Sequence, residues 1–181
     1  MLVPRLPPVT DRDHLRGAAR AVVTLVEYGD YQCPFCGQAF PVLRDIEARF
    51  QRDLAFVFRN FPLTEVHPFA LGAALAAEAA SVQGRFWAMH DQLFEHQDAL
   101  EPDMLIAYAT ELGLDLDRFT TDLAGQRYLS RIRDDFVGGV HGGVNGTPTL
   151  FIDGERYDGR VDRASITTAI ERARGRHAEA R

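Results

Sequence analysis

Cysteine is scarce in this chain: Cys33 and Cys36 are the only two among 181 residues. With 46% hydrophobic residues, the chain has material for a full core without disulfide staples. It also lacks an excess of positive charge, since its net charge is −6 and its pI is near 5.5. Because a nucleic-acid-binding protein needs a basic stripe, we expect no nucleic-acid partner.

Long apolar runs are missing too, so we expect no membrane span. The first ten residues contain three prolines and no apolar core of secretory length, which predicts no signal peptide. A cytoplasmic location is therefore expected, or a periplasmic or extracellular one if a leader was removed. The length suits one domain, or one domain that carries a sizeable insertion.

The two cysteines form the motif Cys33-Pro34-Phe35-Cys36. It lies between an apolar strand-like run and a helical pattern, so we expect Cys33 at the start of a helix and exposed to solvent. There the helix dipole and unpaired backbone N–H groups favour the thiolate and lower the pKa. Pro34 suits the first helical position, and Cys36 lies one turn further in. This pattern predicts a thiol–disulfide exchange centre.

Two other uses of the cysteines were weighed. Zinc needs about four ligands, and none of the six histidines pairs at the spacing of a zinc-binding motif, so no metal is expected. A structural disulfide would close a very short loop, which gives little stabilisation. Redox catalysis without a metal or organic cofactor is the favoured interpretation.

Hydrophobic periodicity predicts an α/β protein: a thioredoxin fold with a helical domain inserted in its middle. Residues 1–20 are expected to form an N-terminal arm or edge strand, and 175–181 a frayed tail. The thioredoxin-like domain is expected over 21–62 and 144–174, and the inserted helical domain over 63–143. The expected strands are 21–28, 54–58, 147–152 and 155–157; the expected helices are about 36–50, 70–82, 86–94, one opened by Pro102, 116–123, 128–140, and a last one capped by Asp162.

Three segments carry a family resemblance: Val23–Cys36, Phe86–Phe94 and Val144–Ile152, the last containing Gly146-Thr-Pro-Thr149. With the Asp153–Gly159 hairpin, they make the chain resemble the DsbA-like branch of the thioredoxin superfamily from about residue 21 to 170. The resemblance implies that the Thr147–Pro148 bond is cis and lies beside the dithiol, the alternative being an ordinary trans proline. It also implies that Thr147 and Pro148, with Pro34 and Phe35, contact an extended substrate.

Glu27 occupies a position that is often acidic in this family, beneath the dithiol. Burial would raise the pKa of its carboxyl, which could then take the proton from Cys36. The alternative is a carboxylate that turns toward solvent. Phe35 stands where the strongest oxidants of the family carry histidine, so the resemblance leaves open whether this pair oxidises or reduces.

The function expected is a protein thiol–disulfide oxidoreductase acting on protein or small-molecule thiols and disulfides, reset by an unidentified redox partner. One alternative is a glutathione-linked enzyme of the kappa-transferase or isomerase type, against which Cys36 argues. Another is a non-catalytic, chaperone-like module that holds peptides. Trp87 and His90 are interpreted as packing residues, and the sequence does not place His141 relative to the site.

Overall fold

The computed structural model describes residues 6–18 and 20–179. Five strands form one sheet in the order β1-β3-β2-β4-β5. The bounds of the strands are β1 His14–Gly17, β2 Val23–Gly29, β3 Leu54–Asn60, β4 Thr149–Ile152 and β5 Glu155–Tyr157. Strand β2 is parallel to β3 and antiparallel to β4, and β1 and β5 are antiparallel edge strands. The expected α/β thioredoxin fold is confirmed.

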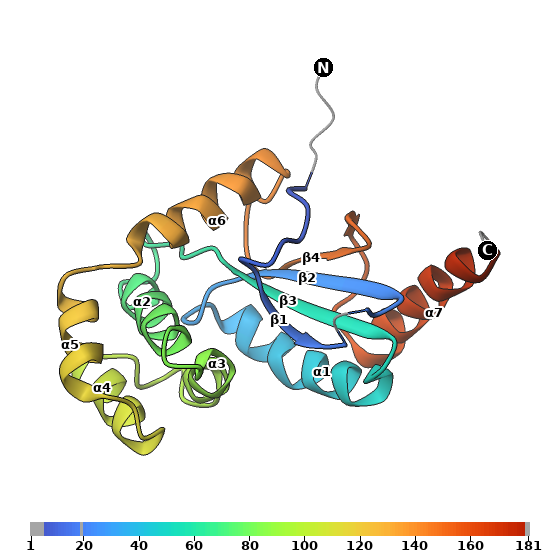
Figure 1. Ribbon diagram of the computed structural model, residues 1–181. Helices are drawn as coiled ribbons and strands as arrows, with labels where there is room; N and C mark the ends of the chain where they lie inside the picture. Colours follow the sequence, from blue (N-terminus) through green and yellow to red (C-terminus); the bar gives the residue numbers. More distant parts are fainter. Residues whose placement is uncertain (1–5, 19, 180–181) are drawn as a thin grey trace.

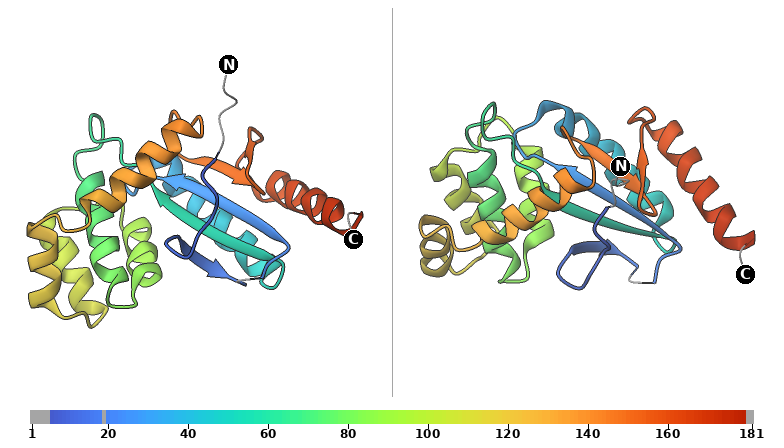
Figure 2. Two further views of the ribbon diagram at one scale, coloured as in Figure 1. Left: turned by 45° about the horizontal axis from the view of Figure 1, so that its top comes forward. Right: turned by 90° about the horizontal axis from the view of Figure 1, so that it is seen from above.

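The described residues form seven helices, whose arrangement around the sheet is shown in Figures 1 and 2. Their bounds are α1 Pro34–Phe50, α2 Ala70–Ser81, α3 Phe86–Glu95, α4 Pro102–Glu111, α5 Leu116–Ala124, α6 Leu129–His141 and α7 Arg163–Glu179. Helices α1 and α7 cover one face of the sheet and α6 the other, while α2 to α5 gather beside it. Helices α2 to α6 all fall between β3 and β4 in sequence, as the inserted helical segment requires.

The alternation of side chains along β2 assigns each residue to one of two cores. Val23 and Leu25 belong to the core under α1 and α7, whereas Val26 and Tyr28 belong to the smaller core that includes Phe136 of α6. Glu27 follows the period of Leu25 and therefore points into the α1 side. This strand is central and almost wholly buried, as its apolar sequence predicts.

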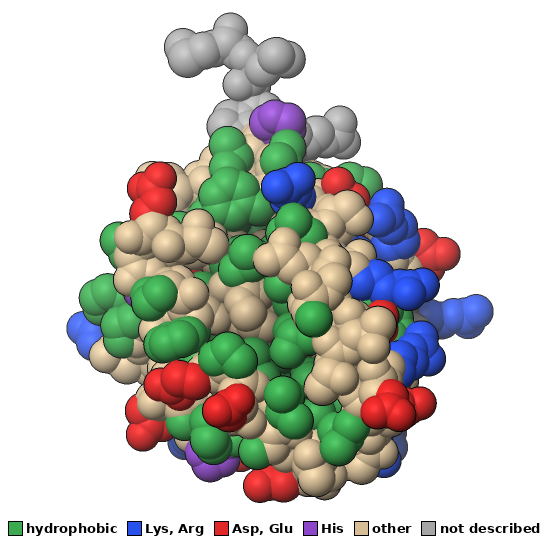
Figure 3. Space-filling model, turned by 90° about the vertical axis from the view of Figure 1, so that its left-hand side faces the viewer, with side chains coloured by type: hydrophobic (Ala, Val, Ile, Leu, Met, Phe, Trp, Pro, Cys, Tyr) green, Lys and Arg blue, Asp and Glu red, His purple; other side chains and the backbone are tan. Residues whose placement is uncertain are grey.

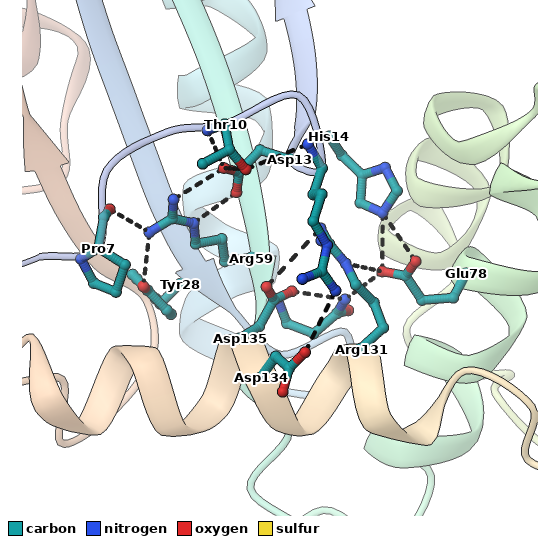
Figure 4. A network of polar contacts seen from close by, with 12 residues as sticks. Pro7, Thr10, Asp13, His14, Tyr28, Arg59, Glu78, Arg131, Asp134 and Asp135 are labelled. Atoms are coloured by element: carbon teal, nitrogen blue, oxygen red, sulfur yellow. Dashed lines mark hydrogen bonds and ion pairs between the residues drawn. The ribbon is translucent and has the colours of Figure 1, made fainter.

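A polar network fastens the N-terminal segment to the rest of the molecule (Figure 4). Arg59 of β3 donates to both carboxylate oxygens of Asp13, to the Pro7 carbonyl and to the Tyr28 hydroxyl, at 2.7–3.1 Å. On the other side of β1, Glu78 of α2 contacts the imidazole of His14 at 2.9 Å. Asp135 of α6 and Asn60 of β3 complete this side of the network.

Most element boundaries lie within two residues of those expected, and two of the differences have a physical cause. Asp162 caps α7 through its bond from the Ser165 N–H at 2.8 Å, and the Asp153-Gly154 turn has φ of 51° and 81° at its centre. Strand β4 begins at Thr149 rather than at Thr147 because a turn containing Pro148, which has no N–H to donate, precedes it. The frayed tail expected from Gly175 is wrong for residues 175–179, which continue α7; residues 180–181 lie outside the described residues.

The extra turn of α7 has a visible cause, since its last charged side chains pair with residues of the sheet end. Arg176 lies 3.8 Å from Glu155 and His177 lies 3.0 Å from Asp153. Within the described part of the chain, no helix is both long and apolar enough to cross a membrane.

Candidate active site

The dithiol lies at the junction between the end of β2 and the start of α1. A tight turn over Asp30–Gln32 follows the strand, and the Cys33 N–H donates to the Asp30 carbonyl at 3.1 Å. Cys33 is the residue that caps α1, with extended backbone angles (φ −71°, ψ 121°), and Pro34 is the first helical residue as predicted. The Cys33 sulfur is therefore at the positive end of the helix dipole.

Pro148 approaches this end of α1 from far along the chain. The Thr147–Pro148 peptide bond is cis, and Cys33 Sγ donates to the Thr147 carbonyl oxygen at 3.4 Å. The cis bond and its place beside the dithiol are thus confirmed. Thr147 Oγ1 is buried and has no hydrogen-bond partner among the described residues, so its hydroxyl is free to turn toward the sulfur of a thiolate.

The environment of Cys33 favours ionisation. A hydrogen bond from the Cys36 thiol is the largest influence, and with contributions from Thr147 and the backbone of Cys36 and Phe35 it lowers the pKa of Cys33 to about 5 against the opposing effect of burial. The expectation that Cys33 is exposed is wrong, because only 3% of the residue is accessible. The Thr147 carbonyl lies against its sulfur, whereas Pro34 and Phe35 beside it remain exposed.

Cys36 is fully buried, and its chemistry is the opposite of that of Cys33. Burial raises the pKa of the Cys36 thiol well above its usual range, and the bond that Cys36 donates to Cys33 raises it further. Both cysteines are free thiols in this structure. The pair therefore combines a thiol of low pKa at the N-terminus of the helix with a thiol of high pKa one turn further in.

Glu27 lies in β2 with 2% of its surface accessible, which excludes the interpretation that it turns toward solvent. Its Oε1 atom has no hydrogen-bond partner among the described residues. Burial, followed by the charges of Glu47 and Cys33, raises the pKa of Glu27 to about 8. Its neighbour across the parallel ladder is Phe58, which supplies no counter-charge. The carboxyl is therefore protonated at neutral pH and becomes available as a base slightly above it.

Two further side chains of the turn tie it to the loop between β3 and α2, and sequence reasoning missed both. The carboxylate of Asp30 is inaccessible to solvent and accepts from the backbone N–H groups of Gln32 and Leu63 and contacts His67 Nδ1, each at 2.8 Å. Gln32 Oε1 accepts from the Phe69 N–H at 2.7 Å. A one-residue signal such as an aspartate after a strand predicts a turn but does not reveal a partner so far away in sequence.

One large apolar side chain is exposed within the dithiol motif, and another is exposed in the loop that is hydrogen-bonded to its turn. Phe35, between the cysteines, is 64% exposed, and Val66, in the loop that Asp30 anchors, is 67% exposed. Figure 3 shows a face of the molecule on which hydrophobic side chains gather over the inserted helices, with acidic groups along its lower edge. Exposed apolar groups beside a reactive sulfur suit contact with a protein substrate.

His90 and Trp87 make packing contacts, as the sequence suggested, and the structure places His141 at the end of α6. His90 is buried among aromatic rings and bonded to the Tyr31 hydroxyl at 3.1 Å, and burial lowers the pKa of its imidazole, which stays neutral. His141 is the last residue of α6 and is exposed. Trp87 packs on Phe56 and donates to the Leu15 carbonyl, so it joins the inserted helices to the sheet edge.

Fold and dithiol together define a protein of the thioredoxin class. A family model described as thioredoxin matches residues 9–172, so the chain belongs to that family. Within it, the structure is similar to BdbD from Bacillus subtilis in its oxidised form, with a TM-score of 0.85, 25% identity and coverage of 96% of this chain and 98% of that one. It is also similar to a thioredoxin-like oxidoreductase from Silicibacter pomeroyi DSS-3, with a TM-score of 0.82, 26% identity, and 92% and 94% coverage.

The likeness extends to α-DsbA1 of Wolbachia pipientis, with a TM-score of 0.83, 20% identity and 96% coverage of each chain, which shows the fold. The expected resemblance to the DsbA-like branch is therefore confirmed. The fold is that of the thiol–disulfide oxidoreductases.

Sequence relatives place the same unit in larger proteins. The chain is 48% identical over 168 residues to Na(+)/H(+) antiporter NhaA 1 of Salinispora arenicola and 44% identical over 167 residues to NhaA 1 of Mycolicibacterium gilvum. These matches cover 93% and 91% of this chain but 26% and 27% of those proteins. The chain thus spans about a quarter of the length of the relatives it matches, and their name describes the whole proteins.

Proposed function

We propose that this protein is a thiol–disulfide oxidoreductase in which Cys33 exchanges with the substrate and Cys36 resolves the mixed disulfide. The observation that carries the proposal is the pairing of opposite pKa shifts, about 5 for Cys33 and well above the usual range for Cys36, next to the Thr147–Pro148 turn. A low-pKa thiolate is both the better attacking group at neutral pH and the better leaving group.

In the oxidising direction, a substrate thiolate attacks Cys33 Sγ, and the bond between the two cysteines breaks. Cys36 leaves with the electron pair and takes a proton. A second substrate thiolate then attacks the substrate sulfur of the mixed disulfide, so that the substrate becomes a disulfide and Cys33 leaves as the thiolate. In the reducing direction the same steps run backward, and a thiol or disulfide partner resets the pair.

Glu27 is proposed as the group that exchanges a proton with Cys36. Its buried carboxyl has a pKa of about 8 and shares an electrostatic environment with both cysteines. When Cys36 leaves as a thiolate, the neutral carboxyl can protonate it, and when Cys36 attacks, the carboxylate can accept its proton. Burial keeps bulk water from doing this quickly.

Substrate contact is assigned to Thr147, Pro148, Pro34 and Phe35, with the substrate extended along the backbone of Thr147. We propose the domain division that the sequence suggested, with the thioredoxin-like domain over 21–62 and 144–174 and an inserted domain over 63–143. In this arrangement the dithiol lies in the first domain, near the boundary with the second.

The pKa of Cys33 also suggests a direction. Thioredoxin has a cysteine pKa of about 7 and a reduction potential near −270 mV. DsbA has a cysteine pKa of about 3.5 and a reduction potential near −120 mV. A pKa of about 5 lies between them, so we propose an intermediate potential, to be measured in a glutathione buffer. A value at or beyond either limit would contradict this assignment.

Three variants test the function. With an oxidised, disulfide-containing model protein as substrate, Cys33→Ser should abolish exchange, and Cys36→Ser should accumulate a mixed disulfide between Cys33 and the substrate. Gln38→Ser, on the exposed side of α1, should behave as wild type. A purely peptide-holding module predicts that Cys33→Ser suppresses aggregation of an unfolded protein as well as wild type does, with no exchange in either. A glutathione-linked enzyme predicts that Cys36→Ser retains activity.

The antiporter relatives favour a second proposal, about the partner of this site. In these relatives, a segment that is 42–48% identical to more than nine-tenths of this chain forms part of a protein named as an NhaA antiporter. A unit that is joined to an antiporter in one chain lies close to it, which favours thiols of NhaA-type antiporters as exchange partners. The Cys36→Ser variant, with Cys33 first converted to its mixed disulfide with glutathione, should exchange with vesicles that contain such an antiporter and give an adduct that dithiothreitol removes, with glutathione as the leaving thiol. An adduct that forms equally in vesicles without the antiporter would overturn this proposal and leave the exchange chemistry standing.

A further inference from the structure

Gln97 reaches the dithiol turn from the loop between α3 and α4. Its amide Nε2 donates to the Tyr31 carbonyl at 2.7 Å and to the Cys33 carbonyl at 3.0 Å. The other end of the amide lies over Gly37, where a Cβ atom would overlap Gln97 Oε1. Glycine at the first turn of α1 therefore leaves the space that this side chain needs.

The two carbonyls need this donor for a physical reason. Tyr31 is 1% exposed, and a buried carbonyl without a donor is costly. The Cys33 carbonyl accepts only one helical bond, from the Gly37 N–H, and both carbonyls belong to the turn that presents the Cys33 sulfur. Their negative ends near a thiolate are unfavourable unless an N–H group compensates them.

We propose that Gln97 is a positioning residue for the dithiol, which fixes the Cys33 turn against the inserted helices and favours the thiolate by compensating these two carbonyls. The inference deepens the proposed function, on which it rests. Gln97 holds the turn from the α3–α4 side, while Asp30 and Gln32 hold it from the β3–α2 loop. Through Gln97, the inserted segment thus contributes to the reactivity of the Cys33 sulfur.

A substitution series at Gln97 tests the proposal by following thiolate absorbance during a pH titration of reduced protein and by the equilibrium with glutathione. Gln97→Met keeps the length and loses the donor, so we expect a three- to tenfold smaller thiolate equilibrium constant and an equally less oxidising pair, about the strength of one hydrogen bond. Gln97→Lys keeps a donor and should stay within twofold of wild type or shift the opposite way. Gln97→Glu should be worse than Gln97→Met.

Gln92→Met is the matched control, since Gln92 is a partly exposed α3 residue whose amide contacts only the Glu111 carboxylate. It should leave both measurements unchanged. A steric role alone predicts that all three Gln97 variants fail alike, and unchanged titration in folded Gln97→Met overturns the proposal. The titration needs no substrate, so an inactive wild-type protein would refute the proposed function without deciding the role of Gln97.

Gly37→Ala gives an independent check. Alanine favours helix, so it should not weaken α1 by itself, but its methyl group displaces the Gln97 amide. We expect it to shift the Cys33 titration in the direction of Gln97→Met, and to have no further effect in a Gln97→Ala background. Additive shifts in the double variant would contradict the link between these two residues.

Discussion

At the scale of single residues, two identical thiols behave differently because of what surrounds each sulfur. Cys33 receives a hydrogen bond and lies at a helix N-terminus, whereas Cys36 gives that hydrogen bond and lies fully inside the core. The low pKa of one and the high pKa of the other are therefore parts of a single arrangement. Changing the surroundings of Cys33 should change both its titration and the potential of the pair.

Phe35 offers the cleanest change of this kind. It is 64% exposed, so replacing it removes little core packing. Phe35→His places a cation beside the thiolate, which should lower the pKa of Cys33 by roughly one unit and make the disulfide about tenfold more oxidising. Thiolate absorbance and glutathione equilibria measure the two effects. Phe35→Leu, which adds no charge, should change neither; an equal shift in both variants would exclude electrostatics as the cause.

Glu27 should make stability depend on pH. The pKa of Glu27 in the folded protein, about 8, lies above the ordinary value of 4.5, so its contribution to stability is fully present below pH 4.5 and is lost as the pH rises through 8. Glu27→Gln removes this loss and should raise the free energy of unfolding above pH 8 by roughly 3–5 kcal/mol relative to the parent. Denaturant unfolding in a Cys33→Ser background isolates the effect from the thiolate. A pH-independent difference would show that the carboxyl is not buried as an acid.

Some of these residues are predictable from sequence and others are not, for a physical reason. Cys33, Cys36 and Pro148 can be identified from their residue types alone, because disulfide exchange needs cysteine and a cis peptide bond is common only before proline. Asp30 and Gln97 are polar residues whose importance depends on partners contributed by other segments. The burial of Cys33 is not predictable for the same reason, because the Thr147–Pro148 turn that lies against its sulfur follows the inserted helices in sequence.

At the scale of elements, hydrophobic periodicity and turn residues located the helices and the strands β2 to β5, whereas β1 was expected only as an arm or edge strand within residues 1–20. Contacts between elements set the ends. Helix α7 shows this, since residues 175–179 read as polar tail and yet remain helical where Arg176 and His177 find acidic partners. Strand β4 shows the reverse, because residues 147–148 were expected in the strand but form the turn before it. Local sequence decides the type of element, and its surroundings decide the length.

Helix α7 should be held by its apolar face rather than by its charges. Ile166, Ile170 and Ala173 are fully buried, whereas the ion pair between Arg174 and Asp53 is partly exposed. Ile170→Ala should lower the free energy of unfolding by about 2–5 kcal/mol, and Arg174→Gln by less than about 1 kcal/mol. Denaturant titration compares the two. Equal losses would mean that the ionic contacts, and not the core, fix this helix.

At the scale of the whole molecule, the network around Arg59 joins the N-terminal segment and the sheet, and the neighbouring Glu78 and Asp135 bring in α2 and α6 (Figure 4). Arg59 is 4% exposed, and Asp13 is its buried partner. Arg59→Met should cost about 3–5 kcal/mol of unfolding free energy, because it leaves the Asp13 carboxylate buried and unpaired. Arg12→Met, at an exposed ion pair, should cost less than about 1 kcal/mol.

The double variant Asp13→Asn, Arg59→Met decides whether that cost comes from the orphaned charge. Removing both charges should recover a substantial part of the stability lost in Arg59→Met alone. If the two substitutions are instead additive, the arginine acts mainly through packing and its bonds to the Pro7 carbonyl and the Tyr28 hydroxyl. Denaturant unfolding of Asp13→Asn, Arg59→Met and the double variant measures these free energies. They can be compared if the slope of unfolding free energy against denaturant concentration is the same in all three.

The redox state of the dithiol should also change the stability of the entire fold. The pKa of Cys33 in the folded protein, about 5, lies below the ordinary value of 9.0, so its contribution to the stability of the reduced protein is fully present above pH 9 and is lost as the pH falls through 5. The reduced protein should therefore gain roughly 2 kcal/mol over the oxidised protein between pH 5 and pH 7.

Thermal or denaturant unfolding of both redox states at several pH values measures this gain directly. A variant without the thiolate, Cys33→Ser, should show none of it, because serine does not ionise in this range. Since the same thiolate stabilisation makes the disulfide oxidising, the potential of the pair should rise by the amount that the stability difference requires. A stability gap that stays constant with pH while the potential changes would break this linkage, and with it the assignment of Cys33 as the ionised sulfur.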